Sequence, residues 1–221
     1  MGRTRAVVRI SMGRLVIQRH GFYWPDDTSE SEAQHAIKHV WSVEWAIARC
    51  GTLGRQGTAV QAGGNVGLWP HRLSDVFDHV RTFEPDRIAW ECLRCNVPAR
   101  VIISREALGQ HIGLCNIKHR ALGSARIHIT KGREETMTTI DDQQIEHVDF
   151  LQLDVEGYEW HALQGARDTI ARCKPLIQVE LRGFTEKYGK TDDDVRAFLH
   201  GFGYEQVSAQ SGSDYVFECV R

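Results

Sequence analysis

The feature that most constrains the fold is a glycine-rich segment after a short apolar run, residues 59–67 (Ala-Val-Gln-Ala-Gly-Gly-Asn-Val-Gly). Glycine adopts positive φ without steric cost, so this segment can turn tightly and let the backbone approach a ligand. Apolar residues then recur at spacings of three and four from Val66 to Val80, a periodicity typical of a helix. We therefore expect a strand, a tight loop and a helix whose free N–H groups and positive dipole end face the loop.

An acidic residue follows the next apolar segment. Residues 79–85 indicate a second strand ending in Glu84, about 20 residues past the loop, the spacing at which a Rossmann-like unit places an acid on a ribose. The loop lacks the G-x-G-x-x-G spacing of a pyrophosphate fingerprint, and no P-loop lysine follows it. These departures argue against NAD and ATP and favour a nucleoside-containing ligand without a polyphosphate.

Length and charge exclude several classes of protein. The 221 residues are enough for one α/β domain with a large core. The net charge of −2 provides no broad surface for a polyanion, so a nucleic-acid partner is not expected. No apolar run could cross a bilayer and the first residues do not resemble a signal peptide, so we expect a cytoplasmic protein without membrane contact. The six scattered cysteines fit reduced thiols better than disulfides.

The first 56 residues are expected to form an extension packed on a main domain of residues 57–221. Two β-rich runs within residues 6–17 predict a hairpin, and residues 21–27 have the composition of an aromatic turn. A capping-box pattern at residues 29–32 predicts a helix that continues to Cys50 and is stopped by the glycine after it.

The rest of the chain alternates strands with helices, which predicts a mainly parallel sheet with helices on both faces. The last two strands are joined by a short polar connection and should pair antiparallel. A basic loop at residues 116–120 interrupts the alternation, and such loops often contact substrates. Expected strands occupy residues 99–103, 110–115, 125–130, 147–154, 174–181, 205–209 and 215–220, and expected helices residues 86–96, 158–173 and 192–202.

Acidic residues stand where several of the expected strands end. Asp154 and Glu156 follow a buried-type strand, and Glu180 lies at the end of the next one. Ligands bind outside the carboxyl ends of the strands in such sheets, so these acids, Glu84 and the glycine loop should converge on one site. The competing interpretations are that Asp154 and Glu156 cap the following helix and that Glu180 pairs with Arg182 on the surface.

Histidine and cysteine spacings do not predict a metal site. Cys92 and Cys95 form one CxxC pair within an expected helix, and the sequence has no second pair. His35 and His39 could share a helix face, but two ligands without a nearby third give little reason to expect a metal ion. We therefore expect no metal cofactor.

The order of these motifs resembles that of the FkbM family of methyltransferases, class I enzymes that use S-adenosylmethionine. The resemblance implies a Rossmann-like class I methyltransferase fold over roughly residues 57–220, and the first fifty residues lie outside it. It rests on residues 60–67, 83–85, 107–109, 139–141, 154–157 with Glu159, Leu163 and Gly165, and 179–181.

The resemblance also implies a role for matched positions. Glu84 would hold the ribose hydroxyls, and Asp154 would lie by the methionine portion of the cofactor or the methyl-transfer centre. The family usually has Asp at Gln61 and Ala at Gly64, and Gln61 carries no charge for the cofactor's ammonium group. The implied cofactor-binding residues are Gln61, Gly63, Gly64, Asn65 and Gly67 around the methionine end, Glu84 and Asp154 as above, and Glu106 and Ala107 near the adenine.

The expected reaction is methyl transfer from S-adenosylmethionine to a hydroxyl of a sugar or small metabolite, with S-adenosylhomocysteine as the second product. A hydroxyl acceptor must lose its proton to a base. Candidate bases are Asp154, Glu156, Glu180 and His119, and candidate substrate contacts are His119 and Arg120. The alternatives are an N-methyltransferase or nucleic-acid methyltransferase, a module that binds S-adenosylmethionine without turnover and, more distantly, a dehydrogenase. The sequence leaves the oligomeric state open.

Overall fold

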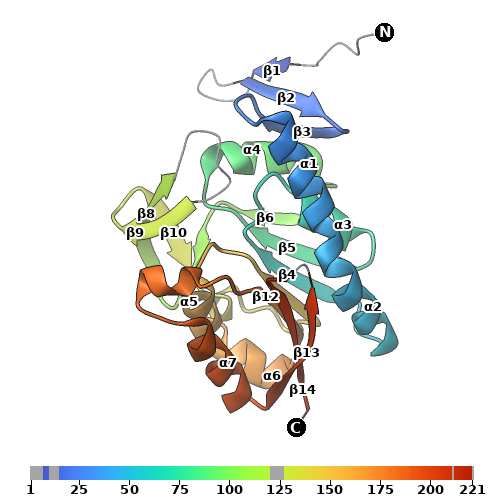
Figure 1. Cartoon of the computed structure of the whole chain (residues 1–221), viewed down its shortest axis with the longest axis vertical. Coiled ribbons are helices and arrows are strands. Elements are labelled where there is room, and N and C mark those ends of the chain that lie inside the picture. Colours follow the sequence, from blue (N-terminus) through green and yellow to red (C-terminus); the bar gives the residue numbers. More distant parts are fainter. Residues whose placement is uncertain (1–6, 10–14, 120–126, 211, 221) are drawn as a thin grey trace.

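The architecture is built on a seven-stranded sheet with the order β13-β14-β12-β11-β4-β5-β6, in a computed structural model that describes residues 7–9, 15–119, 127–210 and 212–220. Helices cover both faces of this sheet, and smaller sheets lie beside it and at the N-terminal end (Figure 1). The strands of the central sheet are β4 (Thr58–Ala62), β5 (His79–Phe83), β6 (Ile102–Ser104), β11 (Phe150–Leu153), β12 (Leu176–Glu180), β13 (Tyr204–Gln210) and β14 (Asp214–Cys219).

Strand β14 is the one that runs against its neighbours. It pairs antiparallel with β12 and with β13, whereas the pairs from β12 through β11, β4 and β5 to β6 are parallel. This confirms the expected mainly parallel sheet with an antiparallel strand near its C-terminal end. Every residue of β11 and β12 is buried, which explains why these strands do not alternate between apolar and polar residues and carry a charged residue only at Glu180, where β12 ends.

The helices after the strands begin near the expected positions, but two of them are shorter. The helices that follow the central strands are α3 (Leu68–Ser74), α4 (Arg87–Asn96), α5 (Glu159–Gln164), α6 (Arg167–Cys173) and α7 (Asp192–Gly201). The apolar periodicity that predicts α3 extends to Val80, but α3 ends at Ser74 and Val80 belongs to β5. The last part of the expected helix is therefore not helical. The helix expected over residues 158–173 is interrupted at Gly165, where a side-chain carbon would lie 2.0 Å from the Gly109 carbonyl oxygen.

The N-terminal residues add a small sheet and a segmented helix. Strands β1 (Val7–Arg9), β2 (Leu15–Arg19) and β3 (Phe22–Pro25) form an antiparallel sheet. Pairing of β1 with β2 confirms the hairpin. The aromatic turn expected at residues 21–27 is wrong for residues 22–25, which form β3, whereas residues 21, 26 and 27 are turns. The capping box at Ser29 is confirmed, and the long helix divides into α1 (Glu30–His39), the 3₁₀ turn η2 (Val40–Val43) and α2 (Glu44–Thr52).

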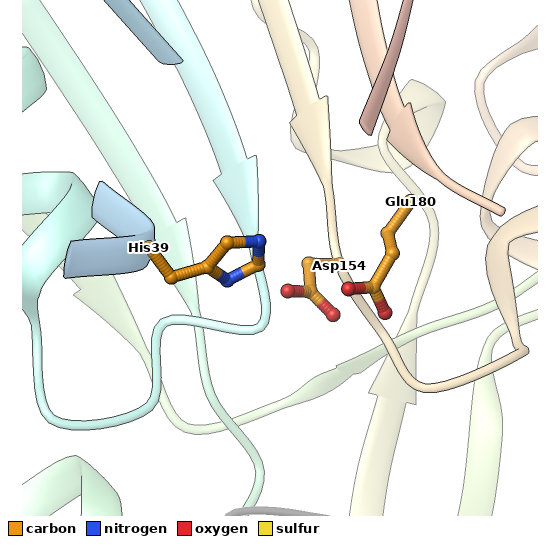
Figure 2. A group of neighbouring side chains, drawn as sticks. All are labelled: His39, Asp154 and Glu180. Carbon is orange, nitrogen blue, oxygen red and sulfur yellow. The ribbon is translucent and has the colours of Figure 1, made fainter. Parts of the chain in front are cut away.

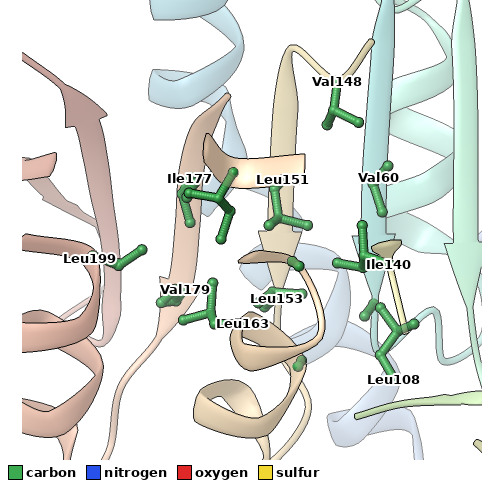
Figure 3. Close-up of a cluster of buried hydrophobic side chains, with 14 of the residues drawn as sticks. Val60, Leu108, Ile140, Val148, Leu151, Leu153, Leu163, Ile177, Val179 and Leu199 are labelled. Carbon is green, nitrogen blue, oxygen red and sulfur yellow. The ribbon is translucent and has the colours of Figure 1, made fainter. Parts of the chain in front are cut away.

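Two hydrophobic clusters hold helices on opposite faces of the central sheet. Leu163 of α5 packs into the cluster that contains Leu151 (Figure 3). Ile47 of α2 packs into the cluster that contains Phe150. Neighbouring residues of a strand point to opposite faces, so Phe150 and Leu151 connect β11 to both layers. The helix of the N-terminal segment therefore covers one face of the sheet, while the division into two domains stays a prediction.

A second sheet stands where the sequence predicts a basic loop. Its strands, in spatial order, are β7 (Ala107–Leu108), β10 (Glu135–Thr138), β8 (Gly113–His119) and β9 (Ile127–Lys131). The loop at residues 116–120 is wrong for residues 116–119, because these pair with β9; Arg120 lies outside the described residues. Short 3₁₀ turns, η3 (Asp141–Gln143) and η4 (Phe184–Tyr188), complete the described elements. Among the described residues, no helix is long and apolar enough to cross a membrane.

Candidate active site

A cavity of about 640 Å³, counted with its open mouth, lies at the carboxyl ends of the central strands. Its lining includes Ala62 at the end of β4, Phe83 at the end of β5 and Asp154 directly after β11. Ile129 of β9 brings the second sheet to the same cavity. This edge is where ligands bind in open α/β sheets.

The glycine loop forms one wall of the cavity. Gly63 has a φ of 81°, and a side-chain carbon on it would lie 1.8 Å from the Asp154 carbonyl oxygen. Gly63 and Asn65 line the cavity. Gly64 instead packs under the loop, where a side-chain carbon would lie 2.5 Å from Leu93, and Gly67 is the left-handed N-cap of α3. The loop therefore needs glycine for close packing of its backbone as well as for its turn.

Glu84 faces the same cavity and is only 4% exposed. Its carboxylate accepts hydrogen bonds from the Asn65 N–H at 2.7 Å and the Asp86 N–H at 2.8 Å. These use two of about four acceptor positions of a carboxylate, so the group is held in place with capacity for two more donors. Burial raises the pKa of Glu84 to about 8, although the two backbone hydrogen bonds oppose this shift.

Gln61 is turned into the sheet. It is fully buried in β4, accepts a hydrogen bond from the Thr82 hydroxyl and donates one to the Ala62 carbonyl at 2.9 Å. The residues that line the cavity do not include Gln61. Its expected role in cofactor binding stays a prediction.

Three acidic residues lie side by side at the ends of adjacent strands. Glu180 of β12 pairs in register with Asp214 of β14. On the other side of β12, Leu153 of β11 pairs with Val179, so the next residue, Asp154, lies beside Glu180. Burial and the nearby Glu180, Glu156 and Glu159 carboxylates raise the pKa of Asp154 well above its ordinary value. The row concentrates negative charge beside the cavity.

Two basic side chains contact this acidic row. Arg182 lies 2.7 Å from Glu180, and His39 Nε2 lies 2.9 Å from Asp214. The contact with Asp214 raises the pKa of His39. Figure 2 shows the His39 ring directed toward Asp154 and Glu180. Residue 39 belongs to α1, so the N-terminal segment reaches the edge of the site.

The turn after Asp154 is held by a different acid. Glu159 is 1% exposed and accepts hydrogen bonds from the Val155 N–H at 3.0 Å and the Gly157 N–H at 3.1 Å. Burial raises the pKa of Glu159 to about 7. Helix α5 starts at Glu159 with Tyr158 as its N-cap, so neither Asp154 nor Glu156 is its cap residue. Both of those acids line the cavity.

Of the other expected contacts, Glu106 and Ala107 line the cavity. His119 lies at the end of β8. Trp69 and Tyr158 also line the cavity without having been predicted there. Tyr158 directly follows the Asp-Val-Glu-Gly motif, which could have drawn attention to it, whereas Trp69 resembles an ordinary apolar helix position.

Comparison with known proteins gives one family match. The family described as "Methyltransferase FkbM domain" matches residues 61–205. No curated protein matches the chain in sequence. The match excludes the N-terminal segment that carries His39.

Several solved methyltransferase structures resemble the chain. Magnesium protoporphyrin IX methyltransferase from Synechocystis PCC 6803 with bound S-adenosylmethionine has a TM-score of 0.52 and 13% identity, covering 88% of this chain and 85% of that one. The FkbM methyltransferase from Methylobacillus flagellatus KT has a TM-score of 0.48 and 17% identity, covering 74% of this chain. The chain spans only 43% of that protein. N-methyltransferase NodS from Bradyrhizobium japonicum WM9 has a TM-score of 0.48 and 11% identity, covering 89% of this chain and 90% of that one.

Proposed function

The chain belongs to the FkbM family of S-adenosylmethionine-dependent methyltransferases, and from this premise we propose that it methylates a hydroxyl oxygen of a sugar or another small metabolite. The observation that carries the proposal is the presence of Glu84 and Asp154 in one cavity at the ends of the central strands. Glu84 can accept hydrogen bonds from the cofactor, and Asp154 can take a proton from the acceptor.

The lining fits the cofactor by the chemistry of its groups. Glu84 keeps acceptor capacity for two donors after its backbone hydrogen bonds, which suits the two ribose hydroxyls. Phe83 and Ala107 provide an apolar wall for the adenine, and Gly63 with Asn65 would border the methionine portion. When bound, S-adenosylmethionine supplies an already electrophilic methyl group, so the chain's main task is to orient the acceptor.

Asp154 is the residue that we assign to the acceptor. It lies at the cavity wall beyond β11, where a carboxylate can take the proton that a hydroxyl loses as its oxygen is methylated. Glu156 lines the same cavity and Glu180 lies beside Asp154, so both stay candidates for this role. A neutral amine acceptor would need no base before attack, which is why the acids favour a hydroxyl.

Calorimetry with four ligands tests the cofactor part of the proposal. S-adenosylmethionine and S-adenosylhomocysteine should bind, and NAD and ATP should not bind comparably. Transfer of a labelled methyl group to pooled small metabolites, followed by chemical analysis of the product, tests the acceptor part. An N-methyl product would refute the hydroxyl acceptor, and tight cofactor binding without transfer to any acceptor would favour a binding module.

A further inference from the structure

We infer that His39, Asp154 and Glu180 form a binding site for one divalent transition-metal ion at the edge of the cavity. One nitrogen or oxygen atom from each side chain lies within 4.8 Å of those of the other two (Figure 2). Metal–ligand bonds of about 2.0–2.2 Å place neighbouring ligand atoms of one ion about 3–3.5 Å apart, so these side chains would have to move together by at most about 2 Å. The binding of the ion is inferred independently of the proposed function. The role of the ion in orienting the acceptor rests on that function.

The three ligands come from independent parts of the fold. Asp154 and Glu180 follow or end adjacent parallel strands, so the sheet register places their carboxylates next to each other. His39 is contributed by the last turn of α1, which lies outside the matched family domain. The site therefore requires the N-terminal segment and is specific to how this chain covers its sheet.

Asp214 gives the histidine the partner that a metal ligand needs. Its side chain is completely buried and lies 2.9 Å from His39 Nε2. Metal-binding histidines usually direct their second ring nitrogen to a carboxylate or carbonyl, which fixes the ring and its tautomer. Because Nε2 contacts Asp214, the inference requires Nδ1 to be the nitrogen that holds the ion.

The charge of the acidic row is compatible with a bound cation. Asp154, Glu180 and Asp214 place three carboxyl groups in one row, and like charges on adjacent strands destabilise a sheet. Arg182 neutralises one of them. A histidine that ligates a metal is neutral, so Arg182 and one dication together balance the three carboxylates.

A buried polar side chain below the row also lacks a protein partner. Gln178 lies two residues before Glu180 on the same face of β12 and is completely buried. Its amide nitrogen approaches Asp214 at 3.5 Å, while its amide oxygen has no hydrogen-bond partner among the described residues. Buried polar atoms are nearly always satisfied by protein, water or ligand, so a water or a ligand atom is expected beside the Gln178 amide oxygen.

The donor set indicates the class of ion. One imidazole nitrogen with two carboxylate oxygens suits Mn²⁺, Fe²⁺, Co²⁺ or Zn²⁺ better than Mg²⁺, which prefers oxygen alone. Because Asp154 also lines the cavity, the open positions of the ion would face the acceptor. A hydroxyl held there would be oriented and made more acidic, and the carboxylate oxygen of Asp154 that does not bind the ion would take its proton.

Titration of the chelator-treated chain with Mn²⁺ tests the site without any acceptor. The electron paramagnetic resonance signal of free Mn²⁺ should fall until one ion is bound per chain, and pulsed measurements should detect coupling to an imidazole nitrogen. His39→Ala and Glu180→Gln should each weaken binding more than about tenfold, and Asp214→Asn by about ten- to a hundredfold, as for second-shell partners.

His35→Ala is the matched control. His35 is exposed, lies one turn earlier on α1 and stacks on His39 with ring centroids 6.2 Å apart, so its removal should leave Mn²⁺ binding unchanged. Thermal melting checks that each variant is folded. If His39→Ala does not fold, the nitrogen coupling in the unmodified chain still decides the matter.

Absence of tight Mn²⁺ uptake by the unmodified chain would overturn the inference, as would bound Mn²⁺ without nitrogen coupling. The inference would also be overturned if folded His39→Ala and Glu180→Gln variants bound Mn²⁺ as tightly as the unmodified chain. S-adenosylhomocysteine binding, measured with and without Mn²⁺, separates this result from the proposed function. Failure of that ligand to bind would count against the methyltransferase proposal and leave the metal site standing.

Discussion

Titration of Glu84 should control how strongly the cofactor binds at different pH. Its pKa is raised to about 8 by burial, so near pH 6 the carboxyl is almost entirely protonated in the ligand-free protein. Only the carboxylate offers both oxygens as charge-assisted acceptors to the ribose hydroxyls. Cofactor binding should therefore release a proton and become stronger as the pH rises toward 8.

The size of this effect follows from the pKa. With a value of about 8, the carboxylate fraction rises from about one hundredth at pH 6 to about one half at pH 8, so affinity for S-adenosylhomocysteine should increase about fiftyfold. Calorimetry at several pH values gives the affinities. Repeating it at pH 7 in two buffers of different ionisation enthalpy should show release of about one proton per ligand bound.

Glu84→Gln is the control for this experiment, because its amide does not titrate. Its affinity should change with pH only through ionisation of the ligand itself. An unmodified protein with a flat pH profile, or with the same profile as Glu84→Gln, would refute the assignment of Glu84 to the ribose.

The same pKa has a consequence for stability. An unfolded glutamate ionises near 4.5 and the folded one near 8, so the folded state holds more protons between these values. The free energy of unfolding should therefore fall as the pH rises through this window, and Glu84→Gln should reduce that fall. Urea denaturation of both proteins at pH 5 and pH 8 measures it.

Three substitutions test other parts of the account. Asp154→Asn should lower methyl transfer about a hundredfold with little change in melting temperature; full activity per folded molecule would move the catalytic role to another acid. Gly63→Ala should lower the free energy of unfolding far more than Gly54→Ala. Positive φ costs either alanine about 1–2 kcal/mol, but only an alanine at position 63 would also meet a backbone oxygen at 1.8 Å. Equal urea midpoints for the two variants would contradict this. Ile47→Ala should cost about 2–5 kcal/mol by urea denaturation if α2 is an integral cover of the sheet, and a loss below 1 kcal/mol would show a loosely attached extension.

Local sequence patterns were sufficient for the parts of the fold governed by short-range rules. The glycine loop, the capping box at Ser29 and the buried strand before Asp154 all stand where the sequence indicates. Each depends on neighbouring residues, on φ or on burial of a continuous apolar run. The mainly parallel arrangement then follows because strands that alternate with helices favour parallel pairing.

The remaining features depend on contacts between distant segments. Residues 116–119 are polar enough to suggest a loop, yet they form a strand because β9 supplies the partner residues. His39 has no nearby third ligand in sequence, since Asp154 and Glu180 reach it only through the sheet. Gln61 occupies a position where the family resemblance suggests cofactor contact, but its amide is engaged by Thr82 within the sheet.

A crystal structure with S-adenosylhomocysteine tests the central claim most directly. The account predicts the ligand in the cavity between the glycine loop and Asp154, with both ribose hydroxyls donating hydrogen bonds to Glu84 and the sulfur directed toward Asp154. A ligand bound elsewhere, or one in this cavity whose ribose does not contact Glu84, would contradict it.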